Sequence, residues 1–189
     1  MADKQLSGIK VAVLVTDGVE QVELLEPKQA LENAGAQVVV ISPHSGRLQG
    51  FKHHDQADKI PIDMELKQVN AAEFDAVLLP GGVINADALR IEKKAQEIVR
   101  AIDNAGKPIA VICHGPWLLV SAGLCRGRTI TSWPTLQDDL RCGGAQWVDQ
   151  EVVRDKNWVS SRKPDDIPAF NREMIRLFAE GQGQSRKIA

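Results

Sequence analysis

The chain has 189 residues, of which 43% are hydrophobic and 25% charged, and its formal net charge at pH 7 is −2. These proportions are typical of a globular protein with a substantial core and exclude a disordered chain. No basic stretch covers a face, so nucleic acid is not an implied partner. The polar N-terminus and the short apolar runs predict neither a signal peptide nor a membrane span. Three cysteines without metal-type spacing favour free thiols in a reducing cytoplasm.

Short apolar runs alternate with amphipathic stretches, which predicts a mostly parallel sheet covered by helices. The predicted buried strands are Lys10–Thr16, Gln37–Ser42, Asp75–Leu79 and Pro108–Ile112, with shorter strands at Val148–Val153 and Trp158–Ser160. The predicted helices are Glu20–Ala34 (kinked or begun at Pro27), Glu92–Ala105, Pro116–Ser121, Thr135–Cys142 and one from Ile167 onward. The segment His44–Leu66 reads as a hairpin and loop.

The chain shows no internal repeat, linker or shift in composition. We therefore expect one domain over residues 1–189, with a core from about 10 to 178 and a loose tail at Gly181–Ala189.

Three unusual segments follow predicted strands: Asp17–Glu23, Pro80–Asp87 and Cys113–Pro116. In open parallel sheets, sites form beyond the carboxyl ends of the strands. We therefore expect these three segments to meet at one edge.

Cys113 is the candidate nucleophile. A sharp turn between a strand and a helix lifts a side chain above the sheet, and Gly115 leaves room for close packing, although Val111 stands where a Gly-x-Ser-x-Gly elbow has its first glycine. The N-terminus of the helix at Pro116 is expected to favour the thiolate and lower its pKa, and backbone N–H groups there could hold an oxyanion. The alternative is an inert, buried cysteine that ends a strand.

His114 is a candidate base for Cys113, or a residue that stabilises the site or binds substrate. Glu20 and Glu23 share one face at the start of a helix. They either interact favourably with the helix dipole or place a protonated carboxyl beside the sulfur.

Asp87 could cap a helix at Ala88–Arg90. Gly81 and Gly82 either let the backbone bend or allow a ligand to approach it. For His44, His53 and His54 we favour solvated surface positions over a metal site.

Several of these segments together resemble the PfpI family of the class I glutamine amidotransferase-like superfamily. The matching segments run from about Lys10 to Phe178: Asp17–Glu23, Leu78–Gly82, Ile112–Pro116, Thr131–Pro134, Asp138–Asp139, Gln146–Asp149 and Trp158–Arg162. The resemblance implies an α/β flavodoxin-like three-layer sandwich with helices on both faces, and a homodimer or larger homo-oligomer.

The resemblance also implies roles for individual residues. It makes Cys113 the nucleophile with His114 beside it, and Glu23 the carboxyl at the sulfur, with Glu20 as a second acid nearby. Asp87 is nearest to an acid that reaches the histidine from another subunit in the peptidase branch, but it stands one residue further along. Trp133 replaces a tyrosine of that branch and joins Gly81, Gly82 and Gly115 as a candidate substrate or oxyanion residue.

Relatives in this family are intracellular cysteine peptidases, general stress proteins, and deglycases or glyoxalases. We expect a cysteine hydrolase that acts on methylglyoxal, glyoxal or their early protein adducts, with no metal or organic cofactor required. The alternatives are an oligomeric cysteine peptidase and a redox-sensing stress protein or chaperone whose cysteine is oxidised without turnover.

Overall fold

The computed structural model describes residues 5–185, with side-chain surroundings up to residue 181. Its central sheet has the strand order β11-β12-β8-β7-β1-β3-β6, and every pairing is parallel except β11 with β12. The strands are β1 (Lys10–Leu14), β3 (Gln37–Ser42), β6 (Met64–Glu65), β7 (Ala76–Leu79), β8 (Ile109–Ile112), β11 (Val152–Asp155) and β12 (Trp158–Ser161). The predicted mostly parallel sheet is confirmed.

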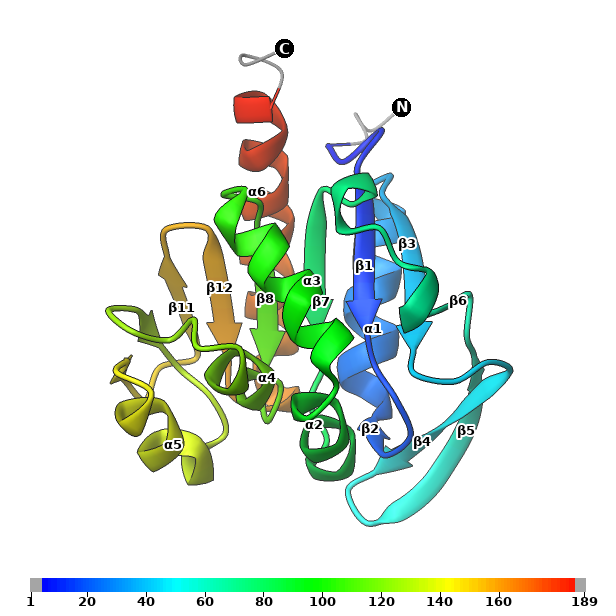
Figure 1. Ribbon diagram of the computed structural model, residues 1–189, viewed down its shortest axis with the longest axis horizontal. Helices are drawn as coiled ribbons and strands as arrows, with labels where there is room; N and C mark the ends of the chain where they lie inside the picture. Colours follow the sequence, from blue (N-terminus) through cyan, green and yellow to red (C-terminus); the bar gives the residue numbers. More distant parts are fainter. Residues whose placement is uncertain (1–4, 186–189) are drawn as a thin grey trace.

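Helices cover both faces of this sheet (Figure 1). α1 (Gln21–Asn33) and α6 (Ile167–Ser185) pack on one face. α2 (Val83–Arg90), α3 (Lys93–Asn104), α4 (Pro116–Ser121) and α5 (Gln137–Cys142) cover the other. Successive residues of a strand point to opposite faces, so Val13 joins the core under α1 and α6 while Ala12 and Leu14 join the other core. The fold is a flavodoxin-like α/β sandwich, as expected.

Smaller elements complete the described chain. A three-stranded sheet contains β2 (Val19–Glu20), β4 (Arg47–Lys52) and β5 (Asp55–Pro61), and β4 and β5 form the predicted hairpin. β9 (Thr129–Ile130) pairs with β10 (Gln146–Trp147). The short 3-10 helices are η1 (Leu66–Gln68), η2 (Ala71–Glu73), η3 (Pro134–Leu136) and η4 (Pro164–Asp166). None of the helices within the described residues is long and apolar enough to cross a membrane.

Four expectations about the elements are wrong. Pro27 does not begin the first helix, because α1 starts six residues earlier and continues through it. Asp87 is not an N-cap, because α2 begins directly after Gly82 and Asp87 lies in its interior. The expected strand at 148–153 is displaced, because β10 ends at Trp147 and β11 begins only at Val152 and ends at Asp155. The expected loose tail is helical as far as Ser185, where α6 ends, and its last residues, 186–189, lie outside the described chain.

Candidate active site

Cys113 stands on a sharp turn between β8 and α4, at the carboxyl edge of the sheet. Its φ is 61°, a left-handed conformation that residues other than glycine rarely adopt. Its backbone N–H donates to the Ser161 carbonyl at 3.1 Å, and its carbonyl accepts from the Trp133 N–H at 3.0 Å. A Cβ on Gly115 would lie 2.6 Å from the Leu79 carbonyl oxygen, so the turn requires glycine there. The neighbouring strands therefore hold the strained cysteine in place.

Glu23 lies in the first turn of α1 and its side chain is completely buried. Its Oε2 accepts the Gly81 N–H at 2.9 Å, while Oε1 has no hydrogen-bond partner among the described residues. Burial raises the pKa of Glu23 to about 8; the Cys113 thiol lowers it, the charge on Glu20 raises it and the Gly81 N–H lowers it. The carboxyl therefore keeps its proton at neutral pH.

Gly81 permits contact between this carboxyl and the thiol. A Cβ at this position would lie 2.3 Å from Glu23 Oε2, 2.5 Å from Cys113 Cβ and 3.0 Å from Cys113 Sγ. Any larger residue would wedge the acid and the sulfur apart. The next residue, Gly82, has φ 87°, and a Cβ there would lie 2.3 Å from the Gly18 carbonyl oxygen. Both glycines are therefore required by close approach, and Gly82 also by its backbone conformation.

The Cys113 thiol does not have the lowered pKa expected from its place before a helix. Burial raises its pKa well above the ordinary value, and the charge on Glu23 raises it further, whereas the backbone N–H groups of Gly82 and His114 lower it. The cause is that α4 has only six residues and Cys113 is buried, so loss of water outweighs the field of the helix end. While Glu23 carries its proton, the repulsive charge is absent and burial is the main effect that opposes the thiolate.

His114 is buried, and its Nδ1 lies 3.2 Å from Cys113 Sγ. The left-handed turn therefore brings adjacent side chains together. The imidazole stands between two tryptophans, edge-on to Trp117 with ring centroids 5.3 Å apart and roughly parallel to Trp133 at 6.0 Å. Burial lowers the pKa of His114 to about 4, so the ring is neutral at pH 7. In the tautomer that leaves Nδ1 unprotonated, a neutral imidazole accepts a hydrogen bond from the thiol, but it is a weak base.

The two remaining acids lie outside this cluster. Glu20 is nearly buried, and its Oε2 accepts the His53 N–H from the turn of the β4–β5 hairpin at 2.9 Å. Glu20 therefore acts on the site through its charge, which raises the pKa of Glu23. Asp87 is exposed in the middle of α2, and the fold of this chain does not bury it beside His114.

The candidate oxyanion donors differ in availability. The N–H of Gly81 is bonded to Glu23, and the N–H of Gly115 donates to the Ile112 carbonyl at 3.0 Å. The N–H of Gly82 interacts with the Cys113 thiol, whose pKa it lowers. A developing oxyanion would therefore meet the N–H groups of Gly82 and His114 rather than those of Gly81 and Gly115.

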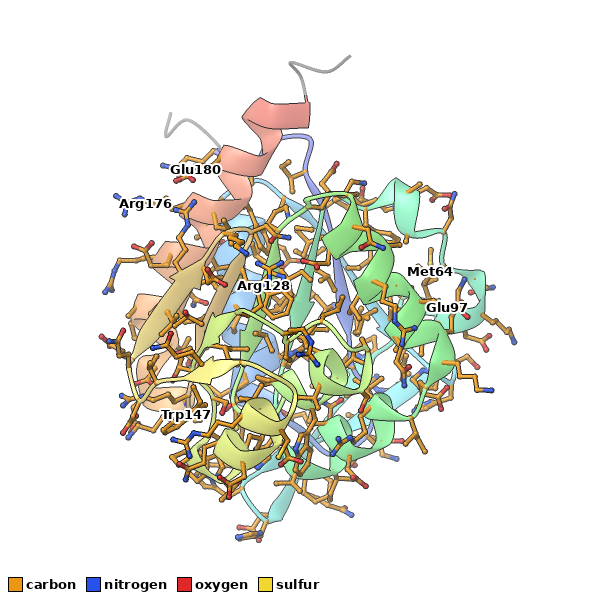
Figure 2. All side chains as sticks on the ribbon, turned by 60° about the vertical axis from the view of Figure 1, so that its left-hand side comes forward. Met64, Glu97, Arg128, Trp147, Arg176 and Glu180 are labelled. Carbon is orange, nitrogen blue, oxygen red and sulfur yellow. The ribbon has the colours of Figure 1, made fainter. Side chains whose placement is uncertain are left out.

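Tryptophans form one wall of the site. Trp133 is 37% exposed and follows Ser132, whose Oγ accepts the Trp147 Nε1–H at 3.0 Å. Trp117 donates its indole N–H to Asp139 at 3.2 Å. Figure 2 shows Trp147 at this end of the molecule, whereas Arg176 and Glu180 of α6 lie at the opposite end. Sequence reasoning singled out Trp133 but missed Trp117, although its spacing of three residues from His114 was a usable signal.

Asn85 is a second residue that sequence reasoning missed, and it contacts the Pro80-Gly81 turn directly. No three His, Cys, Asp or Glu side chains gather as a metal site in the described part of the chain. His44 instead pairs with Asp17 at 3.0 Å, and the His53 ring lies 4.0 Å from Glu20.

The fold and this cysteine site define a class of α/β proteins with a buried acid beside a strained cysteine. The model of the DJ-1/PfpI family matches residues 9–177. The chain belongs to the DJ-1/PfpI family.

Relatives with assigned names match almost end to end. A deglycase of Pyrococcus abyssi is 44% identical over 170 residues, covering 90% of this chain and 99% of its own length. Protein/nucleic acid deglycase 2 of Escherichia coli is 43% identical, covering 89% and 97%. A Bacillus subtilis protein named as a candidate cysteine protease is 42% identical, covering 89% and 98%.

Solved structures agree on the fold. The ThiJ/PfpI domain protein of Brachyspira murdochii superimposes with a TM-score of 0.84 at 23% identity, covering 92% of this chain and 98% of that one.

Proposed function

We propose that this chain is a cysteine-dependent hydrolase of the deglycase or glyoxalase type, acting on methylglyoxal, glyoxal or their early adducts. One observation carries the proposal: a strained, buried Cys113 lies against Glu23, a carboxyl that keeps its proton at neutral pH, and the Gly82 and His114 N–H groups lower the pKa of the thiol. Deglycases are among its close relatives, which supports the same assignment.

The first step suits a site in which the thiol and the carboxyl are both uncharged before the substrate binds. The sulfur adds to the aldehyde carbon of the dicarbonyl. Glu23 gives its proton to the carbonyl oxygen and takes up the thiol proton, so a hemithioacetal forms without net charge in the buried pocket. The N–H groups of Gly82 and His114 stabilise the negative charge that develops on that oxygen.

The two substrate types differ only in how the hemithioacetal forms. In an early adduct the carbon already bears an amino or thiol group, which the Cys113 sulfur replaces, and that group leaves with the thiol proton. In both cases a proton then moves from the first carbon to the second and the hydroxyl proton moves to the second oxygen, which gives a thioester. Water cleaves the thioester to a hydroxy acid and the free thiol. Glu23 and His114 are the proton carriers beside the sulfur. No step calls for a metal or an organic cofactor.

The substrate class extends beyond proteins. The charge of the chain indicates no nucleic-acid partner, but the name of the E. coli relative covers nucleic acid as well as protein. A glycated nucleotide is a small molecule, so acting on it does not require a surface that binds a nucleic-acid polymer. Three free cysteines fit a reducing cytoplasm, which we propose as the location.

We further propose that the chain forms a homodimer or larger homo-oligomer through α2. Val83 and Ile84 are more than half exposed on this helix, and Ile91 is 75% exposed directly after it. An apolar cluster of this kind is typical of a contact surface. Asp87 lies on the same helix, so association through α2 would carry it to a second subunit.

The second candidate function is a cysteine peptidase, favoured by the name of the B. subtilis relative. That chemistry needs His114 to take the thiol proton and carry a positive charge, whereas the subunit alone holds the ring neutral. An acid from a neighbouring subunit would raise the histidine pKa. The peptidase therefore depends on the oligomer, whereas the dicarbonyl chemistry does not.

The test compares wild type with Cys113→Ser on methylglyoxal, on a glycated peptide, on a glycated nucleotide and on an unmodified peptide. We expect turnover of the first three, all lost in Cys113→Ser. Cleavage of the unmodified peptide that disappears in the mutant would instead establish the peptidase. No turnover together with selective peroxide oxidation of Cys113 would point to a redox role.

A further inference from the structure

Asn85 is the third residue of α2, and its side chain is completely buried. Its Oδ1 accepts the Thr16 N–H at 2.7 Å, at the end of β1. Its Nδ2 donates to the Pro80 carbonyl at 3.2 Å and to the Gly81 carbonyl at 2.9 Å. The oxygen faces a donor and the nitrogen faces two acceptors, so only one orientation of the amide fits.

These contacts fix two peptide planes. In a trans peptide the C=O and the following N–H point in opposite directions. The Pro80 carbonyl points to Asn85, so the N–H of Gly81 points the other way, to Glu23 Oε2 at 2.9 Å. The Gly81 carbonyl also points to Asn85, so the N–H of Gly82 points the other way, and this N–H lowers the pKa of the Cys113 thiol.

The chain supplies little else to hold these planes. Gly81 and Gly82 have no side chains to restrict rotation, and Gly82 adopts φ 87°. The other bond to the Gly81 carbonyl, from the Glu20 N–H, is long at 3.4 Å. A plain helix-capping role would require Asn85 to bond within its own first turn. Instead its Nδ2 donates back to the turn before α2, and its Oδ1 accepts from the segment that follows β1.

We propose that Asn85 is a positioning residue, which turns the Gly81 N–H onto the catalytic carboxyl and the Gly82 N–H onto the reacting sulfur and the oxyanion. The role in turnover rests on the proposed function, but the role at the sulfur does not. Asn85 touches neither substrate nor sulfur and acts through the two peptides.

The test uses Asn85→Asp and Asn85→Ala, with Leu89→Ala as the matched control. Asn85→Asp keeps the shape and the acceptor for Thr16 but sets a carboxylate oxygen against two carbonyls. Asn85→Ala removes both functions. Leu89 is buried on the same helix and belongs to the core cluster that does not contain Cys113, so its truncation lowers stability without removing a hydrogen bond to the two peptides.

Two readouts separate positioning from stability. We expect both Asn85 variants to lower kcat on methylglyoxal by at least about tenfold, with KM nearly unchanged, since loss of one oxyanion donor costs about 100-fold or more. We also expect iodoacetamide alkylation of Cys113 to shift to higher pH, because the Gly82 N–H no longer lowers the thiol pKa. Leu89→Ala should show neither change.

The alkylation profile needs no substrate, so it tests Asn85 even where wild type proves inactive on methylglyoxal and the proposed function fails. Folded Asn85 variants with the alkylation profile of wild type would overturn the proposal. Failure of both variants to fold, while Leu89→Ala folds, would overturn it too and leave Asn85 with a structural role.

Discussion

Replacing Glu23 with glutamine removes an ionisable group from the interior while keeping its size and an acceptor for the Gly81 N–H. The pKa of Glu23 rises from 4.5 to about 8 on folding. Between those pH values the folded chain therefore holds a proton that the unfolded chain has released. The stability contributed by this proton is complete below pH 4.5 and is lost as pH rises through about 8.

The size of the effect follows from linkage. One proton changes the free energy of unfolding by about 1.4 kcal/mol per pH unit. Between pH 4.5 and 7 the Glu23 carboxyl therefore costs the wild type roughly 3 kcal/mol of stability. Glu23→Gln lacks this loss, so its stability relative to wild type should grow by that amount over the same interval.

His114 contributes with the opposite sign. Its pKa falls from 6.5 to about 4 on folding, so it adds stability as pH rises through this window. The effect is present in both proteins and cancels in the difference between them. Making the same comparison in the Cys113→Ser background removes the thiol from the titration as well.

The assay is urea unfolding followed by circular dichroism at intervals from pH 4.5 to 8.5. The quantity of interest is the free energy of unfolding of Glu23→Gln minus that of wild type, plotted against pH. Parallel curves for the two proteins would refute the reasoning, because they would mean that Glu23 titrates as an ordinary carboxyl. The same variant should lose dicarbonyl turnover at pH 7, since the amide has no proton to exchange.

Other predictions concern the thiols, a second acid, a largely buried ion pair and the oligomer. The rate of Cys113 alkylation by iodoacetamide, plotted against pH, should have its inflection above the free-thiol pKa of about 8.5, and buried Cys125 should stay unmodified. An inflection below that pKa would mean that the field of the helix dominates over burial. Glu20→Gln should alter Cys113 alkylation less than Glu23→Gln does, and the reverse order would exchange their roles. Asp103→Ala should lower the free energy of unfolding by about 3–5 kcal/mol. The reason is that Asp103 Oδ1 accepts hydrogen bonds from Arg128, Asn157 and Trp158 at 2.8, 3.0 and 2.7 Å. A loss below about 1 kcal/mol in urea unfolding would contradict this prediction. Mixing inactive Cys113→Ser with inactive Asp87→Ala subunits should restore part of any peptidase activity, and no recovery despite proven subunit exchange would confine Asp87 to its own subunit.

The sheet and most helices could be predicted from the sequence because their apolar patterns are strong. Val11–Val15 and Asp75–Leu79 read as buried strands, and α3 shows helical spacing at Ala95, Ile98 and Ile102. The helix α2 lacks such a pattern, because Val83 and Ile84 are exposed on it while the polar Asn85 is buried. The rule that apolar residues face inward fails on that helix, so it could not be predicted.

The candidate site could also be predicted only in part. The meeting of Cys113, Glu23 and the Gly81-Gly82 turn could be predicted, because consecutive parallel strands bring their carboxyl ends to one edge. The charge state of the thiol could not, since a sequence shows the helix after Cys113 but not how completely the sulfur is removed from water. The role of Asn85 could not be predicted either, because its hydrogen bonds connect it to residues that lie 69 and 5 positions away in the sequence.

The tryptophans around His114 give the protein an optical signal of its own. The chain has no tyrosine and four tryptophans, so its near-ultraviolet emission comes from indole alone. Trp117 and Trp133 flank the imidazole, and Trp147 donates a hydrogen bond to Ser132, the residue before Trp133. A charged imidazole quenches a neighbouring indole, whereas a neutral one does so weakly. Emission recorded during an acid titration, or as a ligand enters beside Trp133, therefore reports the state of the site without an added label.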